Sequence, residues 1–515
     1  MLTDDYKVNR PQTVLLPFIT KGENMDDDNK PLIGDIAEEV PQETADETPA
    51  ESGGSVKKHS GFSSKLGFVL AAAGSAVGLG NLWRFPYLAA KYGGGIFLLC
   101  YIALAVTIGF TLLVLEIAIG RKTGKSVIGA FTSLNKKFKW FGFMCLFVPV
   151  IIVPYYSVIG GWVVRYFFAF VGGSDQLLGA NADVAMSGEF FNAFISNPWQ
   201  PILFFLIFAA ATVLIVVFGV QKGIERISKI LMPLLAIIAV FLMIYVMCQP
   251  GALEGVKKFF VPDFSEFSFA TLLAALGQLF YSMSLAMCIM ITYGSYMKKS
   301  ASITKSARQI SICDTCFAIV SALIIIPSIY ALTANPGDVM QSSGPSLMFV
   351  QLPAVFHTLP GGRVIGAIFF LLVFFAALTS SISLVEAIVS VLRENLHWSR
   401  LKSCLVVFAF IIVVGSLSSL GFGPLSVISI AGMTILDILD YVSNSILMPV
   451  VAIITCLLTG HFMDTHTLLD EIGFRKGGGY RKYFLIMVRY IAPICMLAIL
   501  VCNVLQFIFP AIFKF

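Results

Sequence analysis

The chain of 515 residues is 57% hydrophobic and only 13% charged, with a formal net charge of +5. Soluble domains carry about 25% charged residues, so this composition and a mean hydropathy of +0.86 exclude an ordinary soluble domain and indicate an integral membrane protein. The lipid bilayer is therefore an expected partner, and nucleic acid is not.

The first 59 residues differ from the rest of the chain in polarity. Residues 1–56 hold 13 acidic and 4 basic residues and include the polar stretch PQETADETPAESGGS. Because low hydrophobicity and high charge cannot support a packed core, we expect residues 1–59 to be a disordered, acidic cytoplasmic tail before a membrane domain at 60–515. The alternative is a translation start at Met25, since residues 1–24 show no signal-peptide pattern.

Apolar stretches of membrane-spanning length recur along the membrane domain, each able to cross about 30 Å of hydrocarbon as a helix. About eleven such helices are predicted, and they begin near Leu66, Gly95, Phe141, Pro201, Ile224, Phe269, Thr304, Gly362, Lys402, Leu425 and Tyr483. Lys and Arg cluster in every second loop, whereas loops such as 172–199 hold almost none. The positive-inside rule then predicts a cytoplasmic amino terminus and an extracellular carboxyl terminus.

The first span, residues 66–93, reads LGFVLAAAGSAVGLGNLWRFPYLAAKYG and is interrupted in its middle by Gly74, Gly78 and Gly80. A broken helix at this depth is tolerated only where the freed backbone groups face protein, water or a ligand. This pattern predicts a solute-binding site halfway across the bilayer.

The sixth span, residues 276–296, carries a second interruption at Ser282, Met283 and Ser284. Spans one and six each begin a group of five, and paired broken helices at matching positions indicate two inverted repeats. The fold class predicted is an all-α membrane protein with inverted five-helix repeats (spans 1–5 and 6–10) and one extra helix. A single Gly-rich helix would instead indicate close helix packing.

The sequence offers no recognised enzyme motif and no sign of an organic cofactor. The ten cysteines lie mostly inside the predicted spans, and Cys313 and Cys316 have no second pair nearby, so we expect neither a zinc site nor a disulfide framework. No Walker A loop, HExxH, GxSxG or dinucleotide fingerprint occurs. An ATP-driven pump and an enzyme are therefore not expected, and we predict no catalytic residue.

Three motifs of the sequence resemble those of a known protein family. GSAVGLGNLWRFPYLAAKYGGGIFLLCY (74–101), GQLFYSMSL in the sixth span and FFAALTSSISL (374–384) resemble the sodium-coupled neurotransmitter symporter family. The similarity covers about residues 60–513, so residues 60–515 would be the transporter domain. The resemblance implies a bacterial protein of the cytoplasmic membrane, whose eleven spans are typical of bacterial members.

The resemblance also implies two sodium sites. The first would use Ala76, Asn81, Ser282 and Asp314, and the second would use Gly74, Val77, Ala376, Thr379 and Ser380. Sodium is a hard cation that needs oxygen ligands, which unwound backbone and hydroxyl side chains supply. Taken alone, Thr379 and Ser380 could instead pack helices or bond to the i−4 carbonyl.

The implied substrate pocket lies between these ions. Its matching residues are Ser75, Ala76, Leu79, Gly80, Ile152, Tyr156, Tyr281, Ser282, Ser284, Met287, Ser380 and Leu384. The Tyr156 hydroxyl and the half-helix amides near Leu79 would hold a carboxylate, although Tyr156 alone could be a packing aromatic. Ala286 and Cys288 replace glycines found in some relatives and should reduce the pocket volume.

Further charged residues match the gates of the family. Arg84 and Asp440 would close the outer side, with Asp437 as a rival partner for Arg84. Glu394 matches the acidic member of the inner gate, but its usual Arg partner aligns with His59. Glu116 and Glu386 are costly if buried, and Glu116 is expected to support the unwound backbone, unless it reaches the membrane surface.

Asp314 bears on ion coupling. Chloride-dependent relatives hold the anion near residues matching Tyr101, Gln278, Ser282, Asp314 and Ala318, and a fixed carboxylate at Asp314 could replace it. The function predicted is a sodium-coupled importer of a neutral, apolar L-amino acid working by alternating access, independent of chloride and with possible proton countertransport. The alternative is a receptor that binds the amino acid without transporting it. Neither the particular amino acid nor the oligomeric state follows from the sequence.

Overall fold

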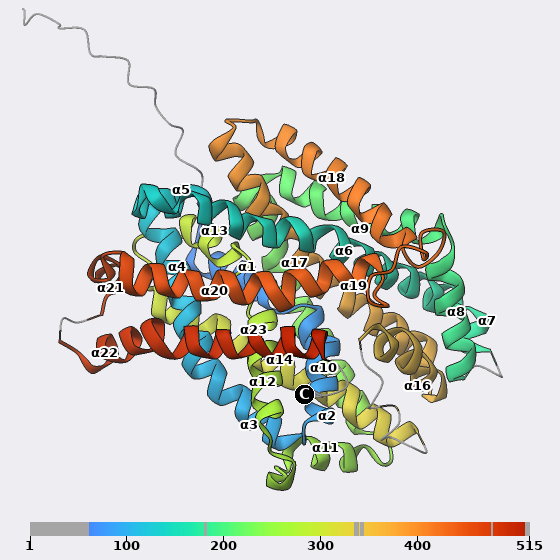
Figure 1. Cartoon of the computed structure of the whole chain (residues 1–515). Helices are drawn as coiled ribbons and strands as arrows, with labels where there is room; N and C mark the ends of the chain where they lie inside the picture. Colours follow the sequence, from blue (N-terminus) through green and yellow to red (C-terminus); the bar gives the residue numbers. More distant parts are fainter. Residues whose placement is uncertain (1–60, 180–182, 334–338, 340–343, 475–476, 510–515) are drawn as a thin grey trace, which may run out of the picture. The chain divides into compact units, whose positions relative to one another are not determined.

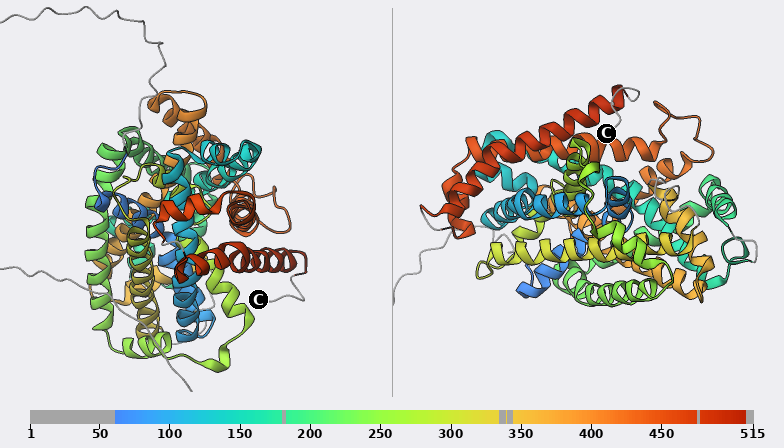
Figure 2. Two further views of the ribbon diagram at one scale, coloured as in Figure 1. Left: turned by 90° about the vertical axis from the view of Figure 1, so that its left-hand side faces the viewer. Right: turned by 90° about the horizontal axis from the view of Figure 1, so that it is seen from below.

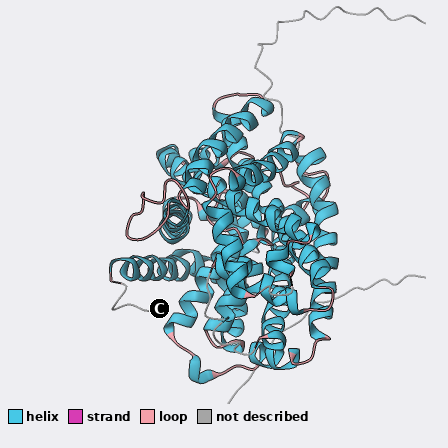
Figure 3. Cartoon of the chain, turned by 90° about the vertical axis from the view of Figure 1, so that its right-hand side faces the viewer, coloured by secondary structure: helices cyan, strands magenta, loops and turns pink. Residues whose placement is uncertain are grey.

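The computed structural model describes residues 61–179, 183–333, 339, 344–474 and 477–509. All regular elements in these ranges are helices, as Figure 3 shows. The predicted all-α fold is therefore confirmed for this part of the chain. The expected tail at 1–59 lies outside it.

Nine segments of the described ranges are long and apolar enough to cross a membrane, and the bent pair Lys65–Ala76 and Gly80–Lys91 makes a tenth. The interrupted pair α12 and α13 completes the eleven predicted spans. In chain order the spans are α1 (Lys65–Ala76) with η1 (Gly80–Arg84) and α2 (Phe85–Lys91); α3 (Gly95–Leu104), η2 (Ala105–Gly109) and α4 (Phe110–Thr123); α6 (Lys139–Gly172); α9 (Gln200–Val217); η4 (Val220–Glu225) and α10 (Arg226–Met247); α12 (Phe269–Ser282) and α13 (Ile289–Ser295); α14 (Ile303–Leu332); α17 (Gly362–Asn395); α18 (Arg400–Leu420); α19 (Ile435–Asp440), η7 (Tyr441–Leu447), α20 (Met448–Leu457) and η8 (Leu458–Phe462); and α22 (Gly479–Ile486), η9 (Met487–Ile491) and α23 (Ala492–Ile508).

Short helices connect these spans at both ends. They are α5 (Val127–Leu134), η3 (Lys136–Phe138), α7 (Asp175–Leu178), α8 (Val184–Ser196), α11 (Ala252–Phe260), η5 (Phe264–Glu266), η6 (Leu347–Gln351), α16 (Leu352–Thr358) and α21 (Thr465–Ile472). In Figure 1, α5 and α21 lie at the left-hand end of the spans, and α7, α8 and α16 lie at the right-hand end. Arg121, near the end of α4, bonds to Glu471 of α21 and to the Ala301 carbonyl oxygen before α14. The basic loops after α4 and before α14 therefore meet at this end, the basic end of the bundle.

Local sequence sets where several helices begin. Ser64 caps α1 by accepting a hydrogen bond from the Gly67 amide at 3.0 Å. Ser268 and Thr271 form a reciprocal capping box at the start of α12, which satisfies two amides that would otherwise lack a partner. The interrupted spans therefore have well-defined first turns.

The tenth span begins ten residues later than the sequence predicts. The apolar run from Leu425 is not helical, because Ala431 and Gly432 have left-handed backbone angles (φ of 54° and 75°). The helix starts at Ile435, after Thr434, whose side chain caps it together with Asp437. The expected start near Leu425 is thus wrong.

The eighth span, α17, lies in the middle of the bundle (Figure 1) and is the most deeply buried of the long spans. It packs against α6, α1, α10 and α9. Spans nearer the outside keep exposed apolar side chains such as Leu203, Ile237 and Ile494, and Figure 2 shows α23 along one edge of the bundle. This is the arrangement expected of a protein solvated by lipid.

Two glycines allow α4 to contact α13 closely. A Cβ atom added at Gly120 would lie 1.9 Å from the Ile291 carbonyl oxygen, and one at Gly294 would lie 2.5 Å from the Ile117 carbonyl oxygen. The second half of the sixth span is therefore held against the second span, backbone to backbone.

Candidate functional site

The two interrupted spans are broken as the sequence predicts. α1 ends at Ala76, and the helix resumes at Gly80 with a bend of 51°. α12 ends at Ser282, and α13 begins only at Ile289. Both breaks expose backbone groups inside the bundle, where side chains or ligands must satisfy them.

Side-chain hydrogen bonds support the break in the sixth span. Ser284, Ala286 and Cys288 all have left-handed backbone angles, with φ of 52°, 60° and 65°. The Ser284 hydroxyl donates to the Ser75 carbonyl oxygen at 2.9 Å, which joins the two breaks directly. The Ala286 amide donates to Glu116 Oε1 at 2.7 Å, which confirms that buried Glu116 supports the unwound backbone.

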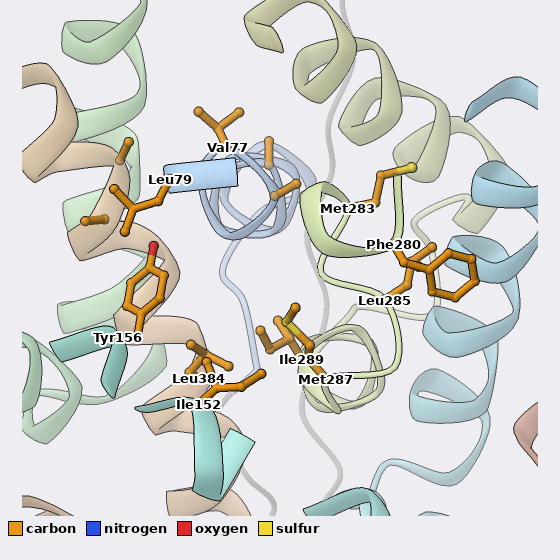
Figure 4. Close-up of a cluster of buried hydrophobic side chains, with 14 of the residues drawn as sticks. Val77, Leu79, Ile152, Tyr156, Phe280, Met283, Leu285, Met287, Ile289 and Leu384 are labelled. Carbon is orange, nitrogen blue, oxygen red and sulfur yellow. The ribbon is translucent and has the colours of Figure 1, made fainter. Parts of the chain in front are cut away.

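A cavity of about 30 Å³ lies between the breaks and the third and eighth spans. Figure 4 shows Met287 and Ile289 close to Ile152 and Leu384, with the Tyr156 hydroxyl pointing toward Leu79. The cavity is lined by Ser75, Leu79, Ile152, Tyr156, Tyr281, Ser284, Met287, Ile289, Ser380 and Leu384. The lining combines apolar side chains with five hydroxyl groups, and no charged residue of the described ranges belongs to it.

Nine of the twelve predicted substrate-binding residues line this cavity. The other three, Ala76, Gly80 and Ser282, are buried beside it. Ile289 lines the cavity but is absent from the predicted set. It is the first residue of α13, and no sequence signal marks Ile289 as the point where this half-helix resumes.

The expectation that Ala286 and Cys288 narrow the pocket is not supported. Neither residue lines the cavity, and the Cys288 thiol donates to the Cys145 carbonyl oxygen at 3.0 Å. The Cys288 side chain therefore contacts the α6 backbone and does not face the cavity.

A polar cluster lies behind the first break. The amide of Asn81 donates to Asp314 Oδ1 at 2.8 Å and to Ser282 Oγ at 3.0 Å. Ser282 also donates to Asp314 Oδ1 at 2.6 Å, and the Tyr101 hydroxyl donates to Asp314 Oδ2 at 2.9 Å. Three of the four residues predicted for the first sodium site are thus in direct contact. Ala76, the fourth, is buried at the end of α1.

The carboxylate of Asp314 is fully buried, and its hydrogen-bond donors are all neutral. None of the ion pairs found among the described residues includes it. A buried charge without a partner is unfavourable, so this cluster suits a bound cation.

A second set of oxygens lies where α1 meets α17. The Ser380 hydroxyl donates to the carbonyl oxygens of Ser75 at 3.0 Å and Ala376 at 3.2 Å, and the Thr379 hydroxyl donates to Ala376 at 3.1 Å. A Cβ atom on Gly74 would lie 3.3 Å from the Thr379 Cβ. The structure therefore brings four predicted residues of the second sodium site together. The fifth, Val77, is the first residue after α1.

A second cavity of about 170 Å³ lies on the other side of Tyr281 and is called here the outer vestibule. It is lined by residues of η1, α2, α12, η7, α20 and α23, among them Arg84 and Asn444. The Arg84 guanidinium lies 5.5 Å from the centre of the Tyr281 ring. Among the described residues, Tyr281 is the one that lines both cavities, so its ring forms the wall between them.

The predicted outer pair is close but not in direct contact. Asp440 accepts a hydrogen bond from Asn444 at 2.6 Å, and Asp437 caps α19 through Thr434. Among the described residues, Arg84 forms no ion pair with either carboxylate, because no N···O distance between them is 4.0 Å or less.

At the basic end, Glu394 accepts a hydrogen bond from the Ser126 amide, just before α5. His59, at the position of its expected partner, lies outside the described residues. The sequence did not predict the ion pair between Glu386 and Arg400. The Tyr296 hydroxyl also donates a hydrogen bond to Glu386 Oε1, at 2.8 Å. No local pattern identifies Arg400 as that partner, because the two residues are on different spans.

Comparisons with known proteins add to this geometry. The sequence model of the sodium:neurotransmitter symporter family matches residues 59–174 and 195–515. The uncharacterized sodium-dependent transporter YhdH of Bacillus subtilis is 35% identical over 442 residues, covering 85% of this chain and 96% of that protein. An uncharacterized sodium-dependent transporter of Haemophilus influenzae is 32% identical over 458 residues, covering 87% and 98%. The crystal structure of MhsT in complex with L-phenylalanine superimposes with a TM-score of 0.77 at 37% identity, covering 86% of this chain and 99% of that one.

Proposed function

The chain belongs to the sodium:neurotransmitter symporter family, and we propose that it imports a neutral, apolar L-amino acid by coupling its movement to sodium. As a member, it is a multi-pass, sodium-dependent membrane transporter and not an enzyme. The observation that carries the proposal is the uncharged cavity between the two helix breaks, with the Asp314 cluster directly behind it.

The cavity lining favours an apolar substrate. Met287, Ile289, Ile152 and Leu384 form an aliphatic wall, while a cationic or acidic side chain of a substrate would find no opposite charge there. The structural neighbour MhsT was crystallised in complex with L-phenylalanine, which is a neutral, apolar L-amino acid. The carboxylate of the amino acid binds between the Tyr156 hydroxyl and the amides near Leu79 at the start of the second half-helix.

Two sodium ions accompany the substrate. The first binds at Ala76, Asn81, Ser282 and Asp314, and the second at Gly74, Val77, Ala376, Thr379 and Ser380. With a membrane potential of about 100 mV and a tenfold sodium gradient, each ion supplies about 3.7 kcal/mol. Two ions therefore support at most about 10⁵-fold accumulation of a neutral substrate.

Asp314 makes transport independent of chloride. Its buried carboxylate supplies a fixed negative charge beside Tyr101 and Ser282, so an anion is not needed to balance the bound sodium. When sodium leaves, a proton neutralises Asp314 during the return of the empty carrier. Proton countertransport follows from this exchange.

Orientation and gating complete the proposal. The positive charge of alternate loops supports an amino terminus in the cytoplasm of a bacterial cell and a carboxyl terminus outside. The outer vestibule then opens to the exterior, and Arg84, Asp440 and Tyr281 close it, while Glu394 belongs to the inner gate. The central cavity is exposed to each side in turn.

Uptake into proteoliposomes tests this function. We expect labelled L-phenylalanine or L-leucine to accumulate only with an inward sodium gradient, with Lys and Glu failing to compete in a panel of the twenty amino acids. Sodium-dependent binding without accumulation would instead support the receptor. Preference for a cationic or acidic amino acid would contradict the proposed substrate class.

The sodium sites have their own test. Asn81→Ala and Thr379→Ala each remove an oxygen from one site, so the sodium concentration for half-maximal uptake should rise severalfold. Thr212→Val is the matched control, because it removes a buried hydroxyl that bonds to Phe208 and Ser381 instead. Unchanged sodium dependence in both site variants would show that the sites are wrongly assigned.

A further inference from the structure

A groove of about 990 Å³ on the outer surface of the bundle has no part in the proposed transport site. It lies between the second span, the first turns of α14 and the start of the eleventh span at α22. Its volume is at the upper end of the range of about 300–1,000 Å³ found for ligand clefts. The groove is thus large enough for a ligand.

Most of the groove wall is apolar. Its lining includes Val106 and Phe110 of the second span, Ile312 of α14 and Tyr483 of α22. Val106 and Ile312 are 66% and 54% exposed, so no helix of the described chain covers them. Apolar walls at the surface of a membrane-spanning bundle suit an acyl chain.

A cation lies at one end of this apolar wall. Arg308, in the second turn of α14, lines the groove together with Thr304 one turn earlier. Arg308 is exposed and takes part in none of the ion pairs found among the described residues. Its guanidinium is therefore free to bind an anion, and its end of α14 is the basic end of the bundle.

Neighbouring acidic residues do not neutralise this charge. Glu471 of α21 accepts from Arg121 at 2.7 Å and from Lys299 at 2.9 Å. Asp470 pairs with Arg481 at 2.9 Å. Both carboxylates of α21 are thus already engaged by other cations.

We propose that this groove binds one anionic phospholipid of the cytoplasmic leaflet, with an acyl chain along the apolar wall and the phosphate on Arg308. A free arginine offers a planar, bidentate donor for phosphate, and basic pockets between helices on the cytoplasmic side are suited to anionic headgroups. A sterol or a second copy of the chain would cover the apolar wall but would leave Arg308 without a partner.

Native mass spectrometry of the detergent-purified protein tests this site. The protein is titrated with phosphatidylglycerol or with phosphatidylcholine of identical acyl chains. The wild type should retain phosphatidylglycerol preferentially, and Arg308→Gln should lower that preference about fivefold, the effect expected of one cation near a membrane surface. Lys122→Gln is the matched control, since Lys122 is an exposed cation at the basic end of α4 that does not line the groove.

A second variant tests the apolar wall without changing charge. Ile312→Trp places a larger side chain in the groove and should weaken retention of both lipids by several fold, while the variant melts at the wild-type temperature. Equal losses in Arg308→Gln and Lys122→Gln would overturn the proposal, as would unchanged retention in Ile312→Trp. Equal binding of the two lipids by the wild type, or a dimer peak that excludes lipid, would also overturn it.

Discussion

Replacing Asp314 by Ser should make the transport, which we propose to be independent of chloride, depend on chloride. The Asp314 carboxylate accepts hydrogen bonds from Asn81, Ser282 and Tyr101 at 2.6–2.9 Å, all from neutral groups. Among the described residues, none of those bonded to the Asp314 carboxylate carries a second negative charge that could balance sodium there. At about 4 Å and an effective dielectric constant near 20, one unit charge stabilises the ion by about 4 kcal/mol.

That energy corresponds to about 10³-fold in sodium affinity as an upper limit. The assay is sodium-titrated uptake into proteoliposomes in chloride and in gluconate. Wild-type uptake should be the same in both media, whereas Asp314→Ser should need far more sodium in gluconate and recover in chloride. Glu189→Gln, which removes an exposed carboxylate on α8, should behave like the wild type.

Two outcomes would refute this reasoning. Chloride-dependent uptake by the wild type would show that the Asp314 carboxylate does not replace an anion. Unchanged sodium dependence of Asp314→Ser in gluconate would show that the carboxylate is not coupled to the ion.

Three further predictions concern other parts of the structure. Tyr281→Ala removes the wall between the two cavities, so bound substrate should dissociate severalfold faster in a radioligand washout, and an unchanged rate would contradict the assignment. Glu116→Ala leaves a buried backbone amide without its acceptor, which costs about 1–3 kcal/mol and should lower the thermal midpoint; Glu116→Gln keeps an acceptor oxygen, and an equal loss would argue against this support. Partial burial alone would raise the pKa of Glu471, but hydrogen bonds from Lys299 and Arg121 outweigh it and hold the pKa below the ordinary 4.5. The stabilisation that the Glu471 carboxylate contributes is complete above 4.5 and disappears as the pH falls through the lowered pKa. Glu471→Gln should therefore lose less thermal stability than the wild type between about pH 5 and about pH 3. Equal losses in the two proteins would refute this.

Much of the fold follows from local sequence, because span length and helix interruption are local properties. Gly78 marks the first break, and Ser282 and Ser284 mark the second, since these residues lower the cost of leaving a helix or replace its lost hydrogen bonds. The start of the tenth span was missed for a related reason. Hydropathy favours Leu425, but the left-handed backbone at Ala431 and Gly432 ends any helix that begins there.

Some site residues could likewise be predicted from local sequence, and others could not. Residues on or beside the breaks, such as Ser75 and Met287, could be predicted, because the break itself places them at the centre of the bundle. The ion pair between Glu386 and Arg400 could not, because it depends on how two separate spans pack. The inclusion of Ile289 in the cavity wall depends on the rotation of α13 after the break, which three left-handed residues set.

The shared position of Tyr281 has a thermodynamic consequence. The same ring lines the outer vestibule and the smaller cavity, so a ligand in either space contacts the side chain that bounds the other, and we expect the two ligands to affect each other's binding. Suppose that a molecule in the vestibule changes the affinity of the cavity for its ligand by some factor. By linkage, the ligand in the cavity changes the affinity of the vestibule for that molecule by the same factor. A compound selected only for binding beside Arg84 would therefore also change the affinity of the cavity for substrate. Whether it raises or lowers that affinity depends on the position of the Tyr281 ring that it favours.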